Sequence, residues 1–373
     1  MTAGKRMVFV GAGHAHLHAL KHCARSVERG HEPVLVAPGP FWYSGLATGV
    51  LGGHYRPELD RVDVGALVAG SGGRFIRDRV SALEPAAKRL TLGSGETLDY
   101  DVVSLNVGSE TPAIAGEREH AGFCYAAKPV KRLVRLRDEL TESAGRGQRP
   151  RIVVAGGGAT AFELAANLLG LAERLDARFD VTVVAGSGRE LAQLPGRAAA
   201  SLVRSLQRRG LRVLRDRRVA RVVDGAVETD TGERLACDRF VNATGLKPPP
   251  LAREAGLPAD DAGALLVDAH LRSVAAPDVF GGGDCIRPAA GAIDKVGVYA
   301  IRQAPVLLAN TLAALDGQPP PETFRPQKNY LWIMNLGDGT GLAARGRLWY
   351  RGRLAFRVKD WIDRRFLRSM QPS

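Results

Sequence analysis

The first residues able to do chemistry lie in the stretch VFVGAGHAHLHAL, at positions 8–20. Gly11 and Gly13 form a pair of the kind that holds a dinucleotide pyrophosphate between a strand and a helix. Gly11 would permit the tight turn and Gly13 the close approach of the phosphate, which the N–H groups at the helix start would bind. The stretch is also rich in histidine, a common metal ligand. Three histidines share one flank of the expected helix: His14, His18 and His22.

The local sequence favours the phosphate loop over a metal site. Residues 7–10 form a continuous apolar run, as in a buried parallel strand, and apolar residues recur after the glycines at helical spacing. No nearby carboxylate or cysteine completes a set of metal ligands, so we expect no metal, with His18 and His22 on a solvated helix face. Two features depart from the usual pattern. His16 takes the place of the third glycine, and no acidic residue ends the second expected strand at 33–40.

A second copy of the pattern strengthens the nucleotide interpretation. The stretch RIVVAGGGATAFELAANLLGLAERL, at 151–175, again predicts a strand, a glycine turn and a helix. Gly156, Gly158 and Ala161 occupy the three positions of the dinucleotide fingerprint. Two such loops in one chain predict two bound nucleotides, as in flavoproteins that pass hydride from a nicotinamide to a flavin.

Length and composition set the broad class. At 373 residues, the chain is long enough for two or three domains. No apolar stretch approaches the ~20 residues that a membrane-spanning helix needs, and the first expected strand begins too early to follow a secretory signal. The four cysteines lie far apart, without a CxxC pair. We therefore expect a protein of the reducing cytoplasm.

The net charge of +13 is concentrated towards the C-terminus, where nine basic residues face two acidic residues between positions 345 and 373. An apolar stripe covers an arc of roughly 140° on the helix expected there. Its members are Leu354, Val358, Trp361, Ile362 and Phe366. Such a helix either lies peripherally on the inner face of a membrane or packs on protein, namely the first nucleotide-binding domain or a second subunit of a homodimer. No recognised nucleic-acid-binding fold accompanies the charge, so we expect no nucleic-acid partner.

Further motifs follow in a fixed order. These are YDVVSLNVGSETP at 100–112, DRFVNATGLKPPP at 238–250 and DVFGGGDCIR at 278–287. With the two glycine loops, the sequence resembles the FAD-dependent pyridine nucleotide-disulfide oxidoreductase superfamily, in particular type II NADH dehydrogenases and sulfide:quinone oxidoreductases. Five more stretches resemble the flavoprotein domain often fused N-terminal to selenide, water dikinase: GAGHAH, FWYSGLATGVLGGHY, KVGVYAIRQAP, FRPQKNYL and GRLAFRVKDWIDRRFLRSM.

The resemblance implies an α/β fold with two Rossmann-like dinucleotide-binding domains, in which the nicotinamide domain is inserted into a discontinuous FAD domain. The implied FAD domain comprises residues 1–117 and 240–325, and the NAD(P)-binding domain residues 118–239. Residues 326–373 would form a small C-terminal region beside the FAD domain, ending in the basic amphipathic helix.

The resemblance also implies which residues contact the cofactors. Asp284 would bind the ribityl chain of FAD, Ser44 and Gly45 would lie by the isoalloxazine ring, and Val80 would offer its backbone to adenine. The full set is Gly11, Gly13, His14, Ala15, Ser44, Gly45, Val80, Asn106, Gly108, Lys128, Gly156, Gly158, Ala161, Gly283, Asp284, Val296 and Gly297.

Two residues are expected to take part in catalysis. Glu163 lies early on the second fingerprint helix, where type II dehydrogenases carry an acid facing the nicotinamide and the flavin. Its alternative role is a first-turn acid that interacts with the helix dipole. Lys295 opens a helix whose N-terminus would stabilise the anionic reduced flavin, and its alternative is an ordinary surface lysine.

These expectations converge on an FAD-dependent NAD(P)H oxidoreductase that reduces a quinone or another small-molecule acceptor. The alternative is an FAD-binding accessory protein of selenium or other specialised metabolism, with little dehydrogenase activity. Ser187 and Arg189 can meet a 2′-phosphate, which slightly favours NADPH over NADH. The absence of a closely spaced cysteine pair argues against disulfide reduction.

Overall fold

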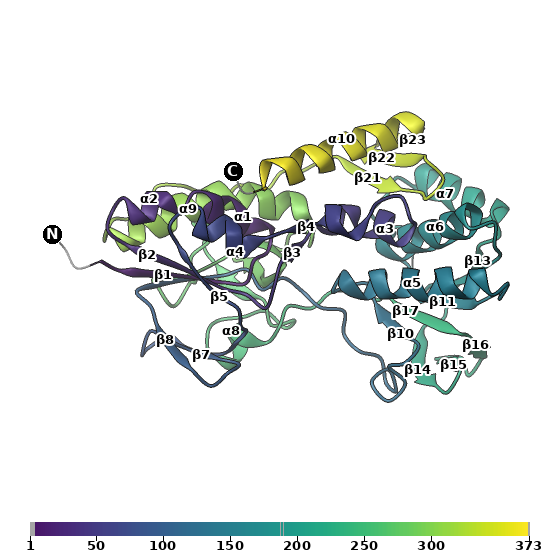
Figure 1. The fold of residues 1–373 in the computed structure, drawn as a ribbon, viewed down its shortest axis with the longest axis horizontal. Coiled ribbons are helices and arrows are strands. Elements are labelled where there is room, and N and C mark those ends of the chain that lie inside the picture. The colour runs from purple at the N-terminus through teal and green to yellow at the C-terminus, as the bar shows by residue number, and fades with distance from the viewer. Residues whose placement is uncertain (1–3, 187, 189, 372–373) are drawn as a thin grey trace.

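The computed structural model describes residues 4–186, 188 and 190–371. The chain folds into two α/β lobes, and a C-terminal segment lies across both of them (Figure 1).

The first lobe is built on a parallel sheet with strand order β19-β9-β1-β2-β5. Small antiparallel hairpins and short helices surround this sheet, except α3, which reaches over to the other lobe (Figure 1). The elements of the lobe are β1 (Arg6–Val10), α1 (His14–Lys21), α2 (Ala24–Val27), β2 (Glu32–Val36), β3 (Phe41–Trp42), α3 (Ser44–Leu51), a 3-10 turn (Pro57–Asp60), β4 (Arg61–Val62), α4 (Val64–Ala69), β5 (Arg74–Ile76), β6 (Val80–Glu84), β7 (Arg89–Leu92), β8 (Thr97–Asp99), β9 (Val102–Leu105), α8 (Leu251–Glu254), β18 (Leu265–Val267), β19 (Val279–Gly281), a 3-10 turn (Gly283–Cys285), β20 (Ile286–Pro288) and α9 (Gly297–Leu315).

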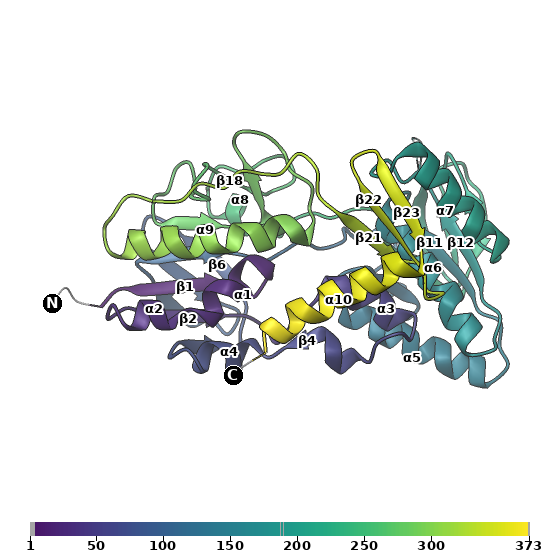
Figure 2. The same cartoon turned by 90° about the horizontal axis from the view of Figure 1, so that it is seen from above.

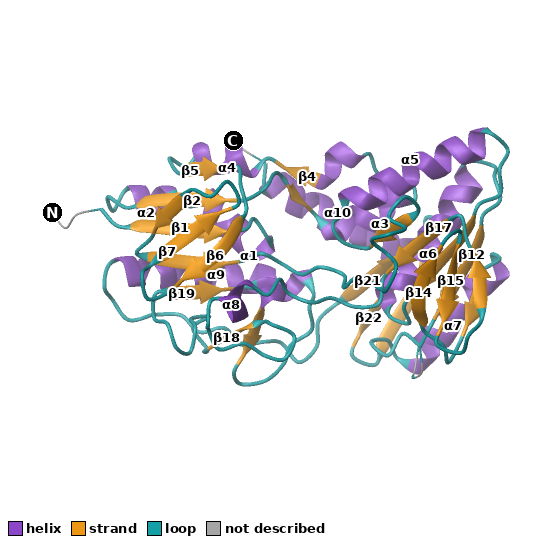
Figure 3. Ribbon diagram, turned by 90° about the horizontal axis from the view of Figure 1, so that it is seen from below, coloured by secondary structure: helices purple, strands orange, loops and turns teal. Residues whose placement is uncertain are grey.

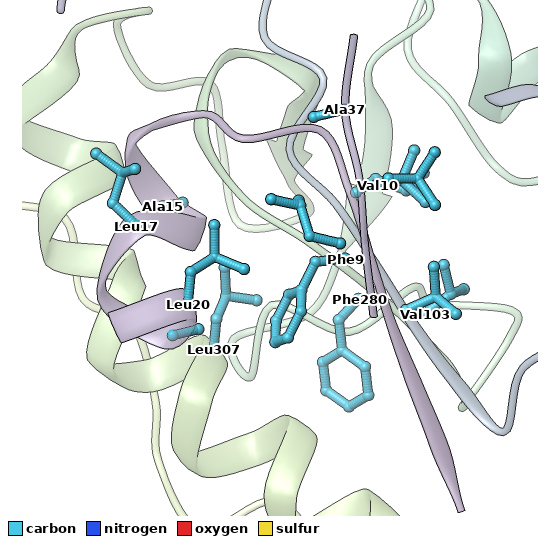
Figure 4. Packing of buried hydrophobic residues seen from close by; sticks show 14 of the residues in the cluster. Phe9, Val10, Ala15, Leu17, Leu20, Ala37, Val103, Phe280 and Leu307 are labelled. Atoms are coloured by element: carbon cyan, nitrogen blue, oxygen red, sulfur yellow. The ribbon is translucent and has the colours of Figure 1, made fainter. Parts of the chain in front are cut away.

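The core of this lobe lies between the sheet and the helices α1 and α9. These two helices lie side by side, and Figure 4 shows their leucines packed towards Phe9 and Phe280 of the sheet. Leu17, Leu20 and Leu307 are at most 1% exposed. Strands buried on both faces read as continuous apolar runs, which is why residues 7–10 could be assigned from the sequence.

The second lobe repeats the design with the parallel strand order β10-β17-β11-β12-β13 (Figure 3). It is inserted between β9 and β19 of the first sheet. Its elements are β10 (Cys124–Ala126), α5 (Lys131–Gly145), β11 (Arg151–Ala155), α6 (Ala159–Arg174), β12 (Asp180–Val184), α7 (Gly196–Arg208), β13 (Arg212–Leu214), β14 (Val219–Val223), β15 (Ala226–Thr229), β16 (Arg234–Ala236) and β17 (Arg239–Asn242). The predicted α/β fold class is confirmed.

The C-terminal segment contains β21 (Trp332–Asn335), β22 (Gly341–Arg345), β23 (Leu348–Gly352) and α10 (Arg353–Ser369). Its antiparallel strands pack on α6, and Met334 and Leu342 join the core of the second lobe. Helix α10 then runs back to the first lobe (Figure 2), whose core includes Leu367. The expectation that this region folds beside the FAD domain is therefore wrong for the strands, which belong to the other lobe.

Helix α10 does not bury its apolar stripe. Its inner face consists of residues four apart, namely Ala355, Lys359, Asp363 and Leu367, all buried. Four stripe members remain 38–62% exposed: Leu354, Val358, Trp361 and Ile362. The expectation that the whole stripe packs on the first lobe is therefore wrong. Of the stripe, only Phe366 packs inward, where its ring stacks on the Tyr43 ring with the ring centroids 4.9 Å apart.

One helix in the described part of the chain, α9, is long and apolar enough to cross a membrane. The expectation that no stretch reaches this length was therefore wrong. However, 67% of the most apolar window of α9 is buried inside the fold. A core helix of a globular lobe explains this composition, since it is surrounded by apolar neighbours.

The close approach of the C-terminal segment to α6 generates the first prediction. A Cβ atom on Gly170 would lie 2.2 Å from the carbonyl oxygen of Gly337. Gly170→Ala should therefore push the two backbones apart and lower the free energy of unfolding by about 1–3 kcal/mol, as overpacking does. Gly145→Ala is the matched control, because Gly145 also lies in a helix and has nothing within 4 Å of the added atom. Urea unfolding measures both, and equal stability of the two variants would contradict the close contact.

Candidate functional site

The first glycine loop is closed by the side chain of Asn106, which follows β9. Its Oδ1 accepts hydrogen bonds from the backbone N–H groups of Ala15 (3.0 Å) and His16 (3.3 Å), and its Nδ2 donates to the Gly282 carbonyl (2.6 Å). A Cβ atom on Gly13 would lie 2.4 Å from Asn106 Oδ1. Asn106 thus joins the loop, the start of α1 and the end of β19, at the carboxyl edge of the sheet where ligands of such folds bind.

The loop retains donors for an anion. The first turn of a helix leaves N–H groups without partners inside the helix. Asn106 satisfies two of them, whereas the N–H groups of Ala12 and His14 have no hydrogen-bond partner among the described residues. Gly11 has φ +84°, and a Cβ atom there would lie 2.6 Å from the Asn106 carbonyl oxygen. The backbone therefore has the form that a pyrophosphate-binding turn requires.

His16, which replaces the third glycine, is a buried link between α1 and the sheet. Its Nδ1 lies 2.7 Å from the Gly11 carbonyl oxygen and its Nε2 2.8 Å from Ser104 Oγ. A carbonyl oxygen can only accept, so Nδ1 carries the proton and Nε2 accepts from Ser104. Burial lowers the pKa of His16 to about 4. In other loops of this kind, the third glycine lets the helix pack closely against the strand. Here the neutral His16 ring fills that place and links the helix to the sheet.

A polar centre lies at the ends of β9 and β19. Asp284 Oδ2 accepts from Ser109 Oγ (2.6 Å) and from Lys128 Nζ (2.8 Å), while Lys295 Nζ donates to the Asp284 carbonyl (2.6 Å). Burial raises the pKa of Asp284, but Lys128, aided by Ser109, outweighs it and holds the pKa below the usual range. Asp284 is thus an anion fixed between two lysines. The structure brings together Asp284, Lys128 and Lys295, which the sequence named separately.

The N-terminus of α9 meets the N-terminus of α1 beside this centre. Val296 is the N-cap of α9, and a Cβ atom on Gly297 would lie 3.5 Å from the ring of His14. Gly283 has φ +74° and donates its N–H to Gln303 of α9 at 2.7 Å. Burial, and then the charge of Lys128, lower the pKa of His14 to about 4. Two positive helix ends therefore converge here without a cationic histidine.

Two further predicted contacts lie in the first lobe. Gly108 has φ +72°, with nothing within 4 Å of an added Cβ atom, so its backbone lies open. Val80 opens β6 on the hairpin of the first lobe and packs partly against that lobe's core.

The start of α3, which carries Ser44 and Gly45, is held by α10. Lys359 Nζ donates to the Gly45 carbonyl at 2.5 Å. Beside it, the Tyr43 ring lies 5.4 Å from the His14 ring and is stacked on Phe366. This arrangement connects the C-terminal helix to the start of α1.

Glu163 lies near the start of α6 and connects three segments. Its Oε1 accepts from Thr48 Oγ1 of α3 (3.0 Å) and from the Asn335 backbone N–H of β21 (2.9 Å). Burial raises the pKa of Glu163, although the charge of Lys359 opposes the rise. Glu163 is therefore more than a helix-dipole residue, since it ties the second lobe to α3 and to the C-terminal segment.

The second glycine loop keeps the full fingerprint geometry. Gly156 has φ +139°, and a Cβ atom there would lie 2.4 Å from the Ala243 carbonyl oxygen. Ala161 is fully buried. Gly158 is the N-cap of α6, and the N–H groups of residues 157–159 have no partner among the described residues.

An open cleft of about 420 Å³ lies beyond β12, where the adenosine end of a nicotinamide nucleotide is expected. Arg204 and Arg215 line it, as does Glu190, whose carboxylate pairs with Arg215 at 2.7 Å. Ser187 and Arg189, on which the NADPH preference was based, lie outside the described residues.

The cysteines are buried as free thiols, and burial raises the pKa of Cys285 to about 11 and of Cys124 to about 12. Among the described residues, no group of three or more histidines, cysteines or acids is placed to hold a metal ion. His18 and His22 lie against each other on α1, with ring centroids 4.3 Å apart.

Several residues of the site escaped the sequence analysis. Ser109 lies three residues beyond Asn106, inside a quoted motif, so the motif could have identified it. Thr48 and Lys359 also lie inside quoted motifs, but their partners are far away in sequence, and Asn335 lies in none of the motifs.

Comparisons with known proteins agree with this geometry. The profile of the pyridine nucleotide-disulphide oxidoreductase family matches residues 5–306. An NADH dehydrogenase-like protein of Mycobacterium tuberculosis is 28% identical over 302 residues, covering 75% of this chain and 72% of the relative. A probable ferredoxin reductase of Castellaniella defragrans is 28% identical over 351 residues, covering 89% and 80%. Among solved structures, NDH2 of Plasmodium falciparum, in complex with NADH, superposes with a TM-score of 0.82 at 13% identity, covering 97% and 96%.

The ion pair at Asp284 generates the second prediction. Lys128→Met removes the charge that offsets the effect of burial on Asp284, so the pKa of Asp284 should rise. Asp284 should then lose its anionic form as the pH falls. FAD retention should then fall by about tenfold as the pH drops from about 7 to 5, a loss of about 1.4 kcal/mol, whereas the wild type should retain its flavin. Flavin fluorescence after gel filtration measures this. Lys131→Met, an exposed lysine at the start of α5, is the control, and identical pH profiles of the two variants would refute the role of Lys128.

Proposed function

The chain belongs to the pyridine nucleotide-disulphide oxidoreductase family, and from this we propose that it is an FAD-dependent NAD(P)H oxidoreductase with a small acceptor, a quinone in the first place. Residues 1–117 and 240–325 would hold FAD, residues 118–239 the nicotinamide, and residues 326–373 the C-terminal region. The observation that carries the proposal is the pair of glycine loops, each with N–H groups free to bind a pyrophosphate.

The residues of the first lobe fit FAD. The loop at Gly11 and Gly13 would bind the pyrophosphate, and the Asp284 carboxylate would accept from the ribityl hydroxyls. The N-terminus of α9 would place a positive helix end at the flavin ring, with Lys295 beside it. FAD supplies the redox chemistry, since a flavin exchanges hydride with a nicotinamide. The protein's part is to bind, orient and exclude water.

Glu163 would relay a proton or position the nicotinamide, since its carboxyl group is buried at the start of α6 and burial raises its pKa. Its bonds to α3 and β21 also fix the angle between the lobes. For the nucleotide we propose NADPH, because Arg204 and Arg215 line the adenosine cleft. Glu190 also lines that cleft, and its negative charge opposes a 2′-phosphate. The rates at which NADPH and NADH bleach the bound FAD therefore have to be compared to decide the preference.

The names of relatives favour an oxidoreductase over an accessory binder, and they suggest a second class of acceptor. The Castellaniella relative is a probable ferredoxin reductase, and another relative, from Pseudomonas putida, is a rubredoxin-NAD(+) reductase. A small redox protein is therefore the second candidate, and reoxidation by quinones against ferredoxins separates the two. The resemblance to the domain fused to selenide, water dikinase stays a prediction. To test it, selenium compounds are added to the acceptors with which reoxidation of the reduced flavin is measured.

The exposed side of the C-terminal segment is proposed to meet an anionic membrane surface. Leu354 and Trp361 are 61% and 62% exposed, and Leu348, at the start of the neighbouring strand β23, is 80% exposed. Basic residues on the same segment attract anionic headgroups at about 1 kcal/mol each. We accordingly propose a cytoplasmic protein, peripheral on the inner face of the membrane. A homodimer formed through the same stripe is the alternative.

The third prediction tests the second glycine loop. A Cβ atom on Gly158 would lie 3.5 Å from Gln193 and is tolerated, but the larger Gly158→Val side chain should obstruct the nicotinamide nucleotide. Anaerobic bleaching of bound FAD by NADPH and NADH should slow by about tenfold or more, equivalent to at least about 1.4 kcal/mol. Flavin content should not change. Gly122→Val, at an exposed glycine with nothing within 4 Å, serves as control. Normal bleaching in Gly158→Val would remove this loop from the proposal.

The fourth prediction tests the membrane surface. The double variant Leu354→Ser/Trp361→Ser should lose more than about tenfold in binding to anionic vesicles, because burial of each side chain contributes about 1.5–3 kcal/mol. Cosedimentation measures binding, and high salt should weaken it in the wild type. Leu59→Ser/Val274→Ser removes comparably exposed side chains elsewhere and should change nothing. If the wild type ignores vesicles and the Leu354/Trp361 variant instead converts a dimer into a monomer, the stripe is a subunit interface.

A further inference from the structure

Helix α10 closes over a set of buried ionisable side chains. Lys359 and Asp363 are 8% and 5% exposed. Lys359 Nζ donates to Asp363 Oδ2 at 2.6 Å as well as to Gly45, and the Tyr43 hydroxyl donates to Asp363 Oδ1 at 2.8 Å. Both Asp363 oxygens and the ammonium group are therefore bonded.

Asp60 belongs to the same set but lacks such bonds. It is fully buried at the end of a 3-10 turn, and neither carboxylate oxygen has a partner among the described residues. Its backbone carbonyl accepts the Tyr43 N–H at 2.9 Å, which places it beside the start of α3. Burial and the charge of Asp363 raise its pKa to about 8, although Lys359 opposes the rise. An unpaired buried carboxylate is costly, so the group takes up a proton instead.

The charge balance of the set requires this proton. Asp60 and Asp363 supply two carboxyl groups, and Lys359 supplies one ammonium group. Burial and Asp363 hold the pKa of Tyr43 far above its usual range, so the phenol stays neutral. With one proton on Asp60 the set is electrically neutral, and without it a buried charge remains uncompensated.

The set adjoins the proposed flavin site. Tyr43 contacts His14 at the start of α1, and Gly297 at the start of α9 lies against the same histidine. Lys359 donates a hydrogen bond to the Gly45 carbonyl. One turn later in α3, Thr48 donates a hydrogen bond to Glu163 of the second lobe. A proton held here is thus next to the place where both helix ends and both lobes meet.

We propose that Asp60 stores the proton that accompanies reduction of a quinone-type acceptor, and that water links it to the bonded pair of Tyr43 and Asp363, since its own carboxyl oxygens bond to neither of them. This rests on the proposed function. A quinone takes two electrons and two protons to become a hydroquinone. NAD(P)H provides both electrons and one proton as a hydride equivalent. The carboxylic acid of Asp60 provides the second proton, becomes a carboxylate and is reprotonated from solvent. Asp60 acts through its neighbours and is a positioning residue.

The test compares two acceptors of the FAD-loaded full chain across about pH 6–9. A water-soluble benzoquinone needs protons for its reduction, whereas ferricyanide takes electrons only. In the wild type, the ratio of quinone to ferricyanide rates should fall as the pH rises through about 8. In Asp60→Asn the ratio should be about a hundredfold lower at neutral pH, the lower end of what a positioned proton donor contributes, and independent of pH. Asp60→Glu should restore part of it, and Glu58→Gln, at an exposed acid in the same turn, should leave it unchanged.

A second measurement detects the proton without activity. The folded state binds a proton on Asp60 that the unfolded chain, with its ordinary pKa, releases, so the melting temperature of the wild type should fall as the pH rises from about 6.5 to 8, above the range in which the buried His14 and His16 act in the opposite direction. Asp60→Asn should remove that part of the slope.

The outcomes separate the two proposals. Equal quinone rates in wild type and Asp60→Asn, or an unchanged melting slope, overturn the proton store. A wild type that bleaches and reduces ferricyanide but no quinone overturns the proton store and the quinone acceptor, and leaves the oxidoreductase standing. No bleaching by either nicotinamide overturns the proposed function, and the melting slope then decides separately whether Asp60 holds the proton.

Discussion

The hydrogen bonds of one side chain, that of Asn106, hold the first site in shape. Its Oδ1 accepts from N–H groups at the start of α1 and lies close to Gly13, and its Nδ2 donates to the carbonyl of Gly282 at the end of β19. Asn106 and Gly282 are 176 positions apart, and the second lobe lies between them in the chain. A buried amide that bonds to two other segments fixes their positions relative to β9 more strictly than apolar packing, because its bonds are directional and each is costly to break. Asp284 and Lys128 can then meet at the sheet edge.

The second constraint is the contact between the lobes, which depends on polar side chains of α3 and α10. Helix α3 packs Ala47 and Leu51 into the core of the second lobe, where its Thr48 donates to Glu163, and Lys359 of α10 donates to Gly45 at the start of the same helix. Neither contact is an exposed ion pair that water and salt would weaken. The C-terminal segment therefore does more than extend the fold. Its strands belong to the second lobe and its helix to the first, so the segment acts as a strap between them (Figure 2).

What the sequence predicted, and what it missed, follows from the range of the interactions. The glycine loops are local: strand, turn and helix lie within about 15 residues, and the apolar pattern of β1 and α6 identified both. The pairing of Asp284 with Lys128 joins residues 156 positions apart, and motif order suggested only that both were near the flavin. His16 looked like a defect in the fingerprint, because its two hydrogen-bond partners, in the loop and in β9, come together only after folding.

The orientation of α10 was the least predictable feature, and its physical reason bears on function. From the sequence, Lys359 and Asp363 form an i,i+4 pair of the kind found on solvated faces, and the apolar stripe is the face expected to be buried. In the fold, the charged pair is buried and most of the apolar stripe is exposed. The pair can be buried because Gly45 and Tyr43, more than 300 residues away, form hydrogen bonds with Lys359 and Asp363. Replacing such a pair with apolar residues is often neutral or stabilising, so stability alone does not require three ionisable groups beneath this helix. The chain buries Asp60, Lys359 and Asp363 beside the start of α3 and exposes Leu354 and Trp361 on the other side of α10. Under the function proposed above, this arrangement places the proton-holding groups inside and presents the apolar groups to a membrane from which the acceptor would approach.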